Sequence, residues 1–205
     1  MLIDRLRSIR VLPVLTVHTE EQAIDMVRAL CAGGLHSVEI TLRTSAAKAA
    51  IRAVKKMLPE VTVAAGTVRT VADMEAVTDA GADFLISPGF SLKLSACARS
   101  LNMDFLPGVS TPSEIIAGTE SGHHVFKLFP AQAIGGLALL KALASPFPDI
   151  EFCPTGGIGA VNYKDYLALP NVICVGGSWM IDPELVRQRR WEQVEQLARL
   201  CSELN

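Results

Sequence analysis

Short runs of apolar and β-branched residues alternate with longer amphipathic stretches along the whole chain. Apolar runs of about four to eight residues bounded by turn residues are typical of buried strands, and longer periodic segments are typical of helices. This pattern predicts strands at residues 11–17, 37–41, 61–65, 83–87, 104–106, 125–128, 150–153 and 172–175. The clearest helical segments lie at residues 20–32, 46–57, 71–79 and 183–203.

Several of these helices begin with a recognisable capping residue. Thr111 precedes Pro112 and Glu114, which is the order of an N-cap, a first helical proline and a capping-box acid. Thr19 and Thr70 stand in the same position before two other helical segments. We therefore expect helices to start directly after these three threonines.

Strands that alternate with helices predict a parallel α/β sheet, and a count of eight strands favours a closed (β/α)8 TIM barrel. At 205 residues the chain is short for this fold, so we expect a single domain over residues 1–205 with short loops. Residues 2–9 are expected to form an extra helix that covers the bottom of the barrel, and Pro13 indicates a bulge in the first strand. An open doubly wound sheet is the alternative, which the lack of G-x-G-x-x-G after the first strand disfavours.

Composition excludes several classes of protein. The chain is 50% hydrophobic and 20% charged with a net charge of -2, and its basic residues form no stripe interleaved with aromatics, which disfavours nucleic-acid binding. No apolar stretch approaches the roughly 20 residues that span a bilayer, and the first residues mix charges of both signs, so we expect neither a membrane span nor a signal peptide. The cysteines are scattered, which favours a reducing, cytoplasmic location. No clustered ligand set indicates a metal, and we expect no cofactor.

Lys127 is the most unusual residue, because it lies inside the apolar run Val125-Phe126-Lys127-Leu128-Phe129. Burying an ammonium group is costly unless the group is paired or becomes neutral. A desolvated lysine has a lowered pKa, so its neutral amine can attack a carbonyl and form a Schiff base. The alternatives are a lysine that reaches solvent from a strand end and one that only binds a phosphate.

A carboxylate and a guanidinium occur together in another predicted strand. Glu39, Thr41 and Arg43 alternate with Ile40 and Leu42, so an extended chain places the three polar residues on one side. If that side faces the barrel interior, the carboxylate can transfer protons and the guanidinium can hold a substrate carboxylate. A structural ion pair at the strand end is the alternative.

Other polar and glycine residues also follow predicted strands. In a barrel the carboxyl ends of the strands converge on one face, which carries the active site in such folds. The glycine pairs after the seventh and eighth strands, Gly156-Gly157 and Gly176-Gly177, occupy the loops that commonly bind phosphate, and Ser178 adds a hydroxyl. Two tight turns are the alternative explanation for these glycines.

Taken together, these residues resemble the class I 2-keto-3-deoxy-6-phosphogluconate (KDPG) and 4-hydroxy-2-oxoglutarate (KHG) aldolase family, nearly from end to end. The matching motifs are Gly33-Gly34, Val38-Glu39-Ile40-Thr41-Leu42-Arg43-Thr44, Ala65-Gly66-Thr67-Val68, Ile86-Ser87-Pro88-Gly89, Pro107-Gly108-Val109-Ser110-Thr111, Phe126-Lys127-Leu128-Phe129-Pro130-Ala131, Cys153-Pro154-Thr155-Gly156-Gly157-Ile158 and Gly176-Gly177-Ser178-Trp179.

The resemblance implies an aldolase that reversibly cleaves 2-dehydro-3-deoxy-6-phosphogluconate to pyruvate and glyceraldehyde 3-phosphate. It also implies cleavage of 4-hydroxy-2-oxoglutarate to pyruvate and glyoxylate. Lys127 would form the Schiff base, Glu39 would act as general acid and base, and Arg43 and Thr67 would hold the pyruvate carboxylate. Family members are typically trimers without a metal, so the resemblance implies a homotrimer that binds a small keto acid.

The resemblance places further residues around the rest of the substrate. Thr155 would contact the hydroxyl that decides the stereochemistry, and Pro88 and Phe129 would line the pocket. The residues that would meet the distal phosphate are Gly156, Gly157 and Ser178.

One position departs from the family pattern. Gln132 follows Phe129-Pro130-Ala131 where glutamate is expected, which bears on the range of substrates rather than on the chemistry at Lys127. The remaining alternatives are an aldolase for the 6-phosphogalactonate epimer, a phosphate-binding barrel isomerase that uses Glu39 as a base, and a ligand-binding barrel without catalysis.

Overall fold

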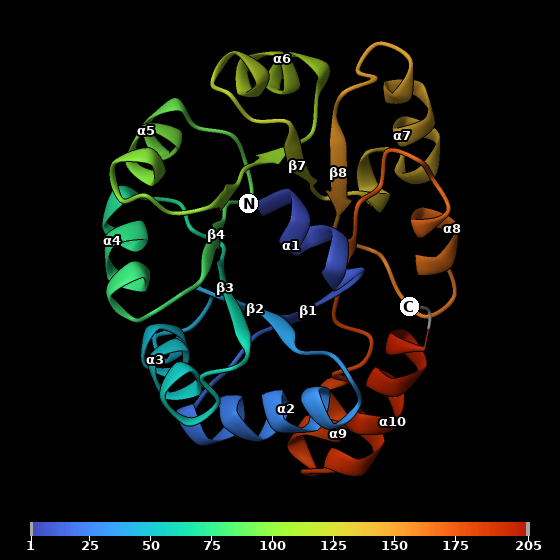
Figure 1. Ribbon diagram of the computed structural model, residues 1–205. Helices are drawn as coiled ribbons and strands as arrows, with labels where there is room; N and C mark the ends of the chain where they lie inside the picture. The colour runs from blue at the N-terminus through green and yellow to red at the C-terminus, as the bar shows by residue number, and fades with distance from the viewer. Residues whose placement is uncertain (1, 204–205) are drawn as a thin grey trace.

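Parallel strands curl around a common centre in the computed structural model, and helices surround them on the outside (Figure 1). The structure describes residues 2–203. The strands are β1 (Val11–Leu15), β2 (Ser37–Thr41), β3 (Thr62–Gly66), β4 (Phe84–Ile86), β5 (Phe105–Leu106), β6 (Gly108–Val109), β7 (Val125–Leu128), β8 (Glu151–Pro154) and β9 (Val175–Gly177). The helices are α1 (Leu2–Ile9), α2 (Glu20–Ala32), α3 (Ala47–Met57), α4 (Val71–Asp79), α5 (Leu92–Ser100), α6 (Pro112–Glu120), α7 (Gly136–Ala144), α8 (Tyr163–Leu167), α9 (Pro183–Arg187) and α10 (Trp191–Ser202), with a 3-10 turn at Gln132–Ile134.

The parallel α/β architecture is therefore as predicted, but the strands do not form one continuous sheet. Six strands pair in the order β5-β4-β3-β2-β1-β9, and three pair in the order β6-β7-β8. The two sheets approach each other where Thr155, directly after β8, forms an isolated parallel bridge with Gly176 of β9. The described strands thus form a curled sheet in two hydrogen-bonded sections.

Proline explains the other division between the sheets. The strand predicted at residues 104–106 is found as β5, and a second short strand, β6, begins two residues after β5 ends. Pro107 lies between them and has no N–H to donate to a ladder, while its carbonyl accepts a 2.9 Å hydrogen bond from the backbone of Lys127. As a result β5 pairs with β4, and β6 pairs with β7.

Two further sequence predictions are wrong in detail. The last strand was predicted at residues 172–175 but is found at β9, since Val172 makes only an isolated bridge to Phe152. No bulge accompanies Pro13, which pairs in regular register with Gly177 of β9. Pairing with β2 begins one residue later at Val14, so the missing N–H of the proline falls where β1 changes partner.

The predicted helix starts are confirmed, and one helix is divided. The side chains of Thr19, Thr70 and Thr111 each accept a backbone N–H of the helix that follows, and Thr111 forms a full capping box with Glu114. The segment predicted as one helix at residues 183–203 consists of α9 and α10. Arg189 lies between these helices with a φ of 53°, which a continuous α-helix cannot contain.

Buried residues form two apolar clusters, one between the strands and the outer helices and one inside the curled sheet. The inner cluster contains Leu12, Phe84, Ile86 and Val125, whose sequence neighbours Val11, Leu85 and Phe126 belong to the outer cluster. This alternation is the period of a strand that is buried on both faces.

Helix α1, which was expected as an extra N-terminal helix, contributes Leu6 and Ile9 to the inner cluster. It crosses the middle of the ring of strands in Figure 1 and leads directly into β1. Helix α1 therefore covers the amino-terminal ends of the strands with apolar side chains.

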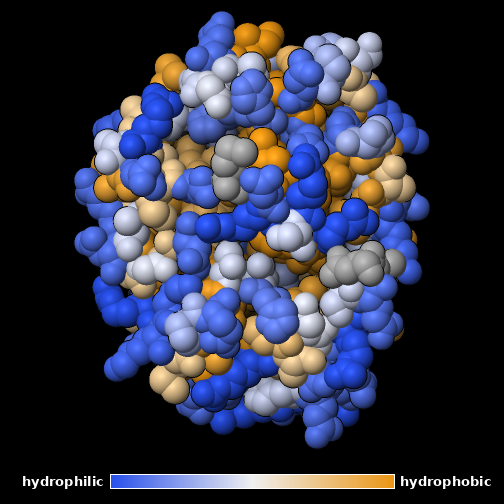
Figure 2. All heavy atoms as spheres, in the orientation of Figure 1, coloured by the Kyte–Doolittle hydropathy of each residue, from blue (hydrophilic) through white to orange (hydrophobic). Residues whose placement is uncertain are grey.

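The face that carries α1 is mostly hydrophilic, and hydrophobic residues are visible between the hydrophilic ones near its centre, at its upper edge and along its sides (Figure 2). No helix within residues 2–203 is both long enough and apolar enough to cross a membrane.

His123 is a partly buried histidine close to this face. Its Nε2 lies 2.9 Å from the Ser95 hydroxyl, and its ring packs edge-on against Phe90, Phe105 and Phe126. Burial, followed by the positive charge of Arg99, lowers the pKa of His123 below its ordinary value of 6.5. The unfolded chain therefore binds a proton at this histidine more readily than the folded chain does.

We expect the free energy of unfolding to fall as the pH drops below about 6.5, because protonation of His123 favours the unfolded state. Urea unfolding of wild type and His123→Gln between pH 7.5 and 5.5 measures this slope, and the variant should show a smaller slope. His36→Gln, a change at an exposed histidine, is the control and should keep the wild-type slope. Identical slopes for wild type and His123→Gln would contradict the prediction.

Candidate active site

Strand alternation places Lys127 and Glu39 on the inner face of the sheet. Val125 belongs to the inner cluster, so Lys127, two residues further along β7, points to the same side. Val38 and Ile40 on β2 belong to the outer cluster, so Glu39 between them points inward. Lys127 is 5% exposed and Glu39 is 1% exposed.

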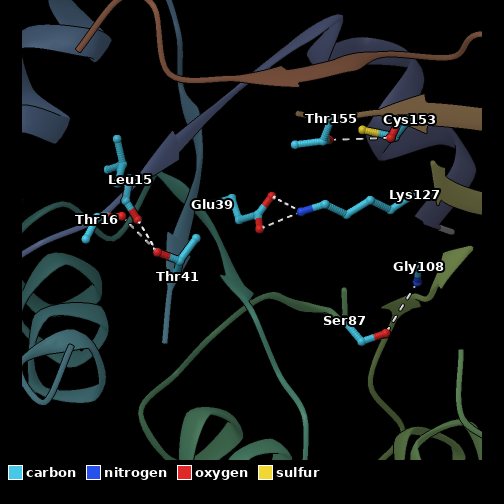
Figure 3. Close-up of polar contacts among 9 residues, drawn as sticks. All are labelled: Leu15, Thr16, Glu39, Thr41, Ser87, Gly108, Lys127, Cys153 and Thr155. Carbon is cyan, nitrogen blue, oxygen red and sulfur yellow. Dashed lines mark hydrogen bonds and ion pairs between the residues drawn. The ribbon is translucent and has the colours of Figure 1, made fainter. Parts of the chain in front are cut away.

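The two side chains extend toward each other across the centre of the molecule (Figure 3). Lys127 Nζ donates hydrogen bonds to Glu39 Oε1 at 2.9 Å and to Oε2 at 3.2 Å. Because β7 and β2 belong to different hydrogen-bonded sheets, this ion pair joins the two sheets. The sequence placed both residues at strand ends that converge on one face, and the structure shows them in contact.

Gly66 provides the space that the Glu39 carboxylate occupies. Thr41 of β2 pairs with Gly66 of β3, and Glu39 pairs with Ala64. A Cβ at position 66 would overlap Oε1 of Glu39 and lie 2.5 Å from its Cγ. A side chain at this position would therefore displace the carboxylate from Lys127.

Phe129, which the resemblance implies as a pocket residue, lies beside the lysine. The Lys127 ammonium is 5.5 Å from the centre of the half-buried Phe129 ring, within the range of a cation–π contact. The Ser110 hydroxyl donates a 2.7 Å hydrogen bond to the Phe129 carbonyl and fixes the backbone there. Sequence reasoning did not single out Ser110, because nothing local links it to a residue 19 positions away.

Thr155 is buried on the inner side at the end of β8. Its hydroxyl lies 3.5 Å from the Cys153 carbonyl, and a Cβ on the facing Gly176 would overlap that hydroxyl. Figure 3 shows Thr155 and the Lys127–Glu39 pair in the same part of the interior. The expectation that Gly176 and Gly177 form a loop or turn after the last strand is wrong, because both lie in β9, where Gly176 makes room for Thr155.

The turn after β4 contains Pro88 and packs against β6. A Cβ on Gly108 would overlap the Pro88 carbonyl, so only glycine permits this approach. The buried Ser87 hydroxyl donates to the Gly89 carbonyl at 2.7 Å and accepts the Gly108 N–H at 3.4 Å. Pro88 is therefore held next to Gly108, whose partner in the register is Lys127.

Arg43 and Ser178 line one cavity of about 560 Å³, together with Thr16, His18, Gln22 and Arg187 among others. The expectation that Glu39 and Arg43 share one face of an extended chain is wrong, because β2 ends at Thr41 and a turn follows. Arg43 is exposed in that turn. Glu39 and Lys127 do not line this cavity. The cavity borders β2 through Thr16, whose hydroxyl lies 3.3 Å from the hydroxyl of Thr41.

Three residues of the predicted site have positive φ angles after strands β3 and β8. Thr67 has a φ of 60°, which is strained for a β-branched residue, and Gly156 and Gly157 have values of 100° and 77°. Such strain persists only where the surrounding structure enforces it, and it is concentrated at functional sites. The sequence identified these residues by position but gave no indication of the strain at Thr67.

We expect Gly66→Ala to lower the free energy of unfolding by about 1–3 kcal/mol, because the new methyl group overlaps the buried Glu39 carboxylate. Urea unfolding measures the change. Gly89→Ala is the matched control, because nothing lies within 4 Å of a Cβ at that position. Equal stability of Gly66→Ala and Gly89→Ala would contradict the packing described for Glu39.

Comparison with known proteins identifies the family. A sequence model of the KDPG and KHG aldolase family matches residues 2–197. The KHG/KDPG aldolase of Escherichia coli K12 is 46% identical over 189 residues, which cover 92% of this chain and 89% of the relative. The 2-dehydro-3-deoxy-phosphogluconate aldolase of Pseudomonas aeruginosa is 46% identical over 193 residues, which cover 94% of this chain and 88% of the relative.

Solved structures agree with these sequence matches. The KDPG aldolase of Legionella pneumophila, crystallised with pyruvate captured at low pH as a covalent carbinolamine intermediate, has a TM-score of 0.96 at 39% identity, covering 98% of both chains. The enzyme of Zymomonas mobilis with 3-phosphoglycerate has a TM-score of 0.91 at 36% identity, covering 99% of this chain and 96% of the other. The chain therefore belongs to the KDPG and KHG aldolase family.

Proposed function

We propose that the chain is a class I aldolase, a carbon–carbon lyase that reversibly cleaves 2-keto-3-deoxy-6-phosphogluconate to pyruvate and glyceraldehyde 3-phosphate. It also cleaves 4-hydroxy-2-oxoglutarate to pyruvate and glyoxylate. The observation that carries the proposal is the buried amine of Lys127 at 2.9 Å from the Glu39 carboxylate, in a chain of this family. A carbinolamine, as captured with pyruvate in the Legionella relative, requires a nucleophilic amine.

Lys127 is the nucleophile in this proposal. Transfer of one proton from Nζ to Glu39 along their hydrogen bond leaves a neutral amine, which attacks the keto carbon of the substrate. Glu39 returns this proton to the carbinolamine hydroxyl, which leaves as water, so that a protonated imine forms and Glu39 is again a carboxylate. The positive nitrogen withdraws electrons from the adjacent carbons and so prepares the C3–C4 bond for cleavage.

Glu39 acts as the general base and then as the general acid. Its carboxylate accepts the proton of the C4 hydroxyl, the C3–C4 bond breaks, and the electron pair moves to the imine as the aldehyde forms. Glu39 helps to return a proton to C3 of the resulting enamine. Water then hydrolyses the imine, which releases pyruvate and restores the Lys127 amine.

The other predicted residues bind the substrate in this proposal. Arg43 and Thr67 hold the pyruvate carboxylate, for which a guanidinium is well suited. Thr155 contacts the C4 hydroxyl, and its buried position near the Lys127–Glu39 pair supports that role. The residues that meet the distal phosphate are Gly156, Gly157 and Ser178, while Pro88 and Phe129 line the pocket.

The family likeness also supports proposals about the whole molecule. The two sheets form the wall of one closed (β/α)8 barrel in which β5 and β6 are a single strand interrupted at Pro107, and residues 1–205 form one domain. The isolated bridges Phe152–Val172 and Thr155–Gly176, and the hydrogen bond from the Lys127 N–H to the Pro107 carbonyl, support this continuity. The assembly is a homotrimer located in the cytoplasm.

We expect incubation with pyruvate and borohydride to add a reduced pyruvate unit to Lys127, detected by peptide mass mapping. Lys127→Met should give no adduct, because it lacks the amine. Lys55→Met is the matched control, since Lys55 forms another 2.9 Å ion pair, with Asp83, outside the strands. An adduct that persists in Lys127→Met would reject the Schiff-base mechanism.

We expect Glu39→Gln to slow borohydride trapping of pyruvate, because Lys127 loses its proton acceptor, and to lower kcat for aldol cleavage by about 10²–10⁴-fold, the usual effect of losing a general base. Steady-state assays of pyruvate release measure this loss. A wild-type kcat in Glu39→Gln would assign the proton transfers to another group.

We expect a higher kcat/KM for 2-keto-3-deoxy-6-phosphogluconate than for its unphosphorylated analogue, since Gly156, Gly157 and Ser178 bind the phosphate in this proposal. Ser178→Ala should lower kcat/KM for the phosphorylated substrate by about tenfold, through the loss of one hydrogen bond to a charged group. Ser100→Ala, at an exposed serine bonded to the Cys97 carbonyl, is the control. Equal rates with both substrates would exclude a functional phosphate site.

A further inference from the structure

The loop of Gly156 and Gly157 is held from two sides by neighbouring segments. On one side the backbone N–H of Gln132 donates to the Gly156 carbonyl at 3.0 Å, and the N–H of Ala131 donates to the Thr155 carbonyl at 2.9 Å. On the other side the Asn162 side chain donates to the Gly157 carbonyl at 3.2 Å. The path of the loop therefore depends on where these segments lie.

The Gln132 side chain links the loop to helix α8. Its Oε1 accepts a 2.6 Å hydrogen bond from the hydroxyl of Tyr166, whose residue is fully buried. Burial raises the pKa of the Tyr166 phenol above its ordinary value, so the hydroxyl keeps its proton and donates. Without Gln132 Oε1 as its acceptor, the buried Tyr166 hydroxyl would carry a desolvation penalty. This hydrogen bond therefore holds the Gln132 side chain in one position.

Two glycines leave room for the Gln132 side chain. A Cβ on Gly157 would overlap the Gln132 Cβ, so the stem of the side chain lies directly against the loop. A Cβ on Gly136, at the start of α7, would lie 2.7 Å from the Tyr166 hydroxyl and 3.0 Å from Gln132 Oε1. Gln132 is thus packed between the loop and a fixed hydroxyl, although much of its surface is exposed.

We infer that Gln132 and Tyr166 are positioning residues that set the Gly156–Gly157 loop for the distal phosphate and so determine the preference for phosphorylated keto acids. The inference rests on the proposed function, in which this loop meets the phosphate. Neither residue touches the reacting carbon atoms in this assignment. Substituting either residue should therefore lower kcat/KM for phosphorylated substrates and leave Schiff-base formation at Lys127 unchanged.

The test compares kcat and KM for 2-keto-3-deoxy-6-phosphogluconate and 4-hydroxy-2-oxoglutarate in wild type and Tyr166→Phe. The substitution keeps the buried ring and removes only the hydroxyl, so the fold should persist. We expect kcat/KM for the phosphorylated substrate to fall by about three- to tenfold, through KM, and kcat/KM for the other substrate to change less than about twofold. Borohydride trapping of pyruvate, which carries no phosphate, should remain at the wild-type level.

Variants at position 132 test the hydrogen bond itself. Gln132→Ala removes the acceptor and should reproduce the loss, and Tyr166→Phe combined with Gln132→Ala should add little to either single change. Gln132→Glu keeps an acceptor oxygen and should retain the wild-type preference. Tyr163→Phe is the matched control, since it removes the other tyrosine hydroxyl of α8, which donates to the Leu200 carbonyl at 3.4 Å.

The outcomes separate this inference from the proposed function. Equal losses for both substrates in Tyr166→Phe, or no loss for either, would overturn the positioning role while leaving an active aldolase. An effect of Tyr163→Phe as large as that of Tyr166→Phe would do the same. Failure of the wild-type protein to trap pyruvate would overturn the proposed function and, with it, this inference.

Discussion

The buried ion pair of Lys127 and Glu39 constrains the rest of the interior. Removing two charges from water costs several kcal/mol for each ion, and only close, well-oriented contact offsets that cost. The contact requires β2 and β7, which belong to different sheets, to face each other with both side chains inward. A slip of either strand by one residue would turn its charge toward the outer helices and leave the partner unpaired.

Small residues around the pair are a consequence of the same constraint. Gly66, Gly108 and Gly176 each lie where a Cβ would overlap a side chain or backbone group of the site. The inner cluster, by contrast, contains bulky residues such as Phe84 and Leu106. The interior thus combines bulky apolar residues, which include Leu6 and Ile9 of α1, with small and polar residues around Lys127.

The sequence was most informative where a residue contradicted its surroundings. Lys127 and Glu39 were identifiable because a charge inside an apolar strand needs a partner, and the helix starts at Thr19, Thr70 and Thr111 are coded locally. The reversal at Arg189 and the turn that moves Arg43 away from the face of Glu39 depend on tertiary packing. The break at Pro107 has a local cause, the missing N–H of proline, which the predicted strand at residues 104–106 did not take into account. The contacts of Gln132 with Tyr166 were equally inaccessible, since they join segments 34 residues apart.

Helix α1 has a consequence for the order of kinetic events. Because its apolar residues Leu6 and Ile9 cover the amino-terminal ends of the strands, we expect substrate to reach Lys127 from the carboxyl-terminal ends. Under the proposed mechanism pyruvate is still bonded to Lys127 when the aldehyde becomes free. Product release is then sequential, with the aldehyde first and pyruvate last, so that pyruvate is the product that competes with new substrate for the free amine.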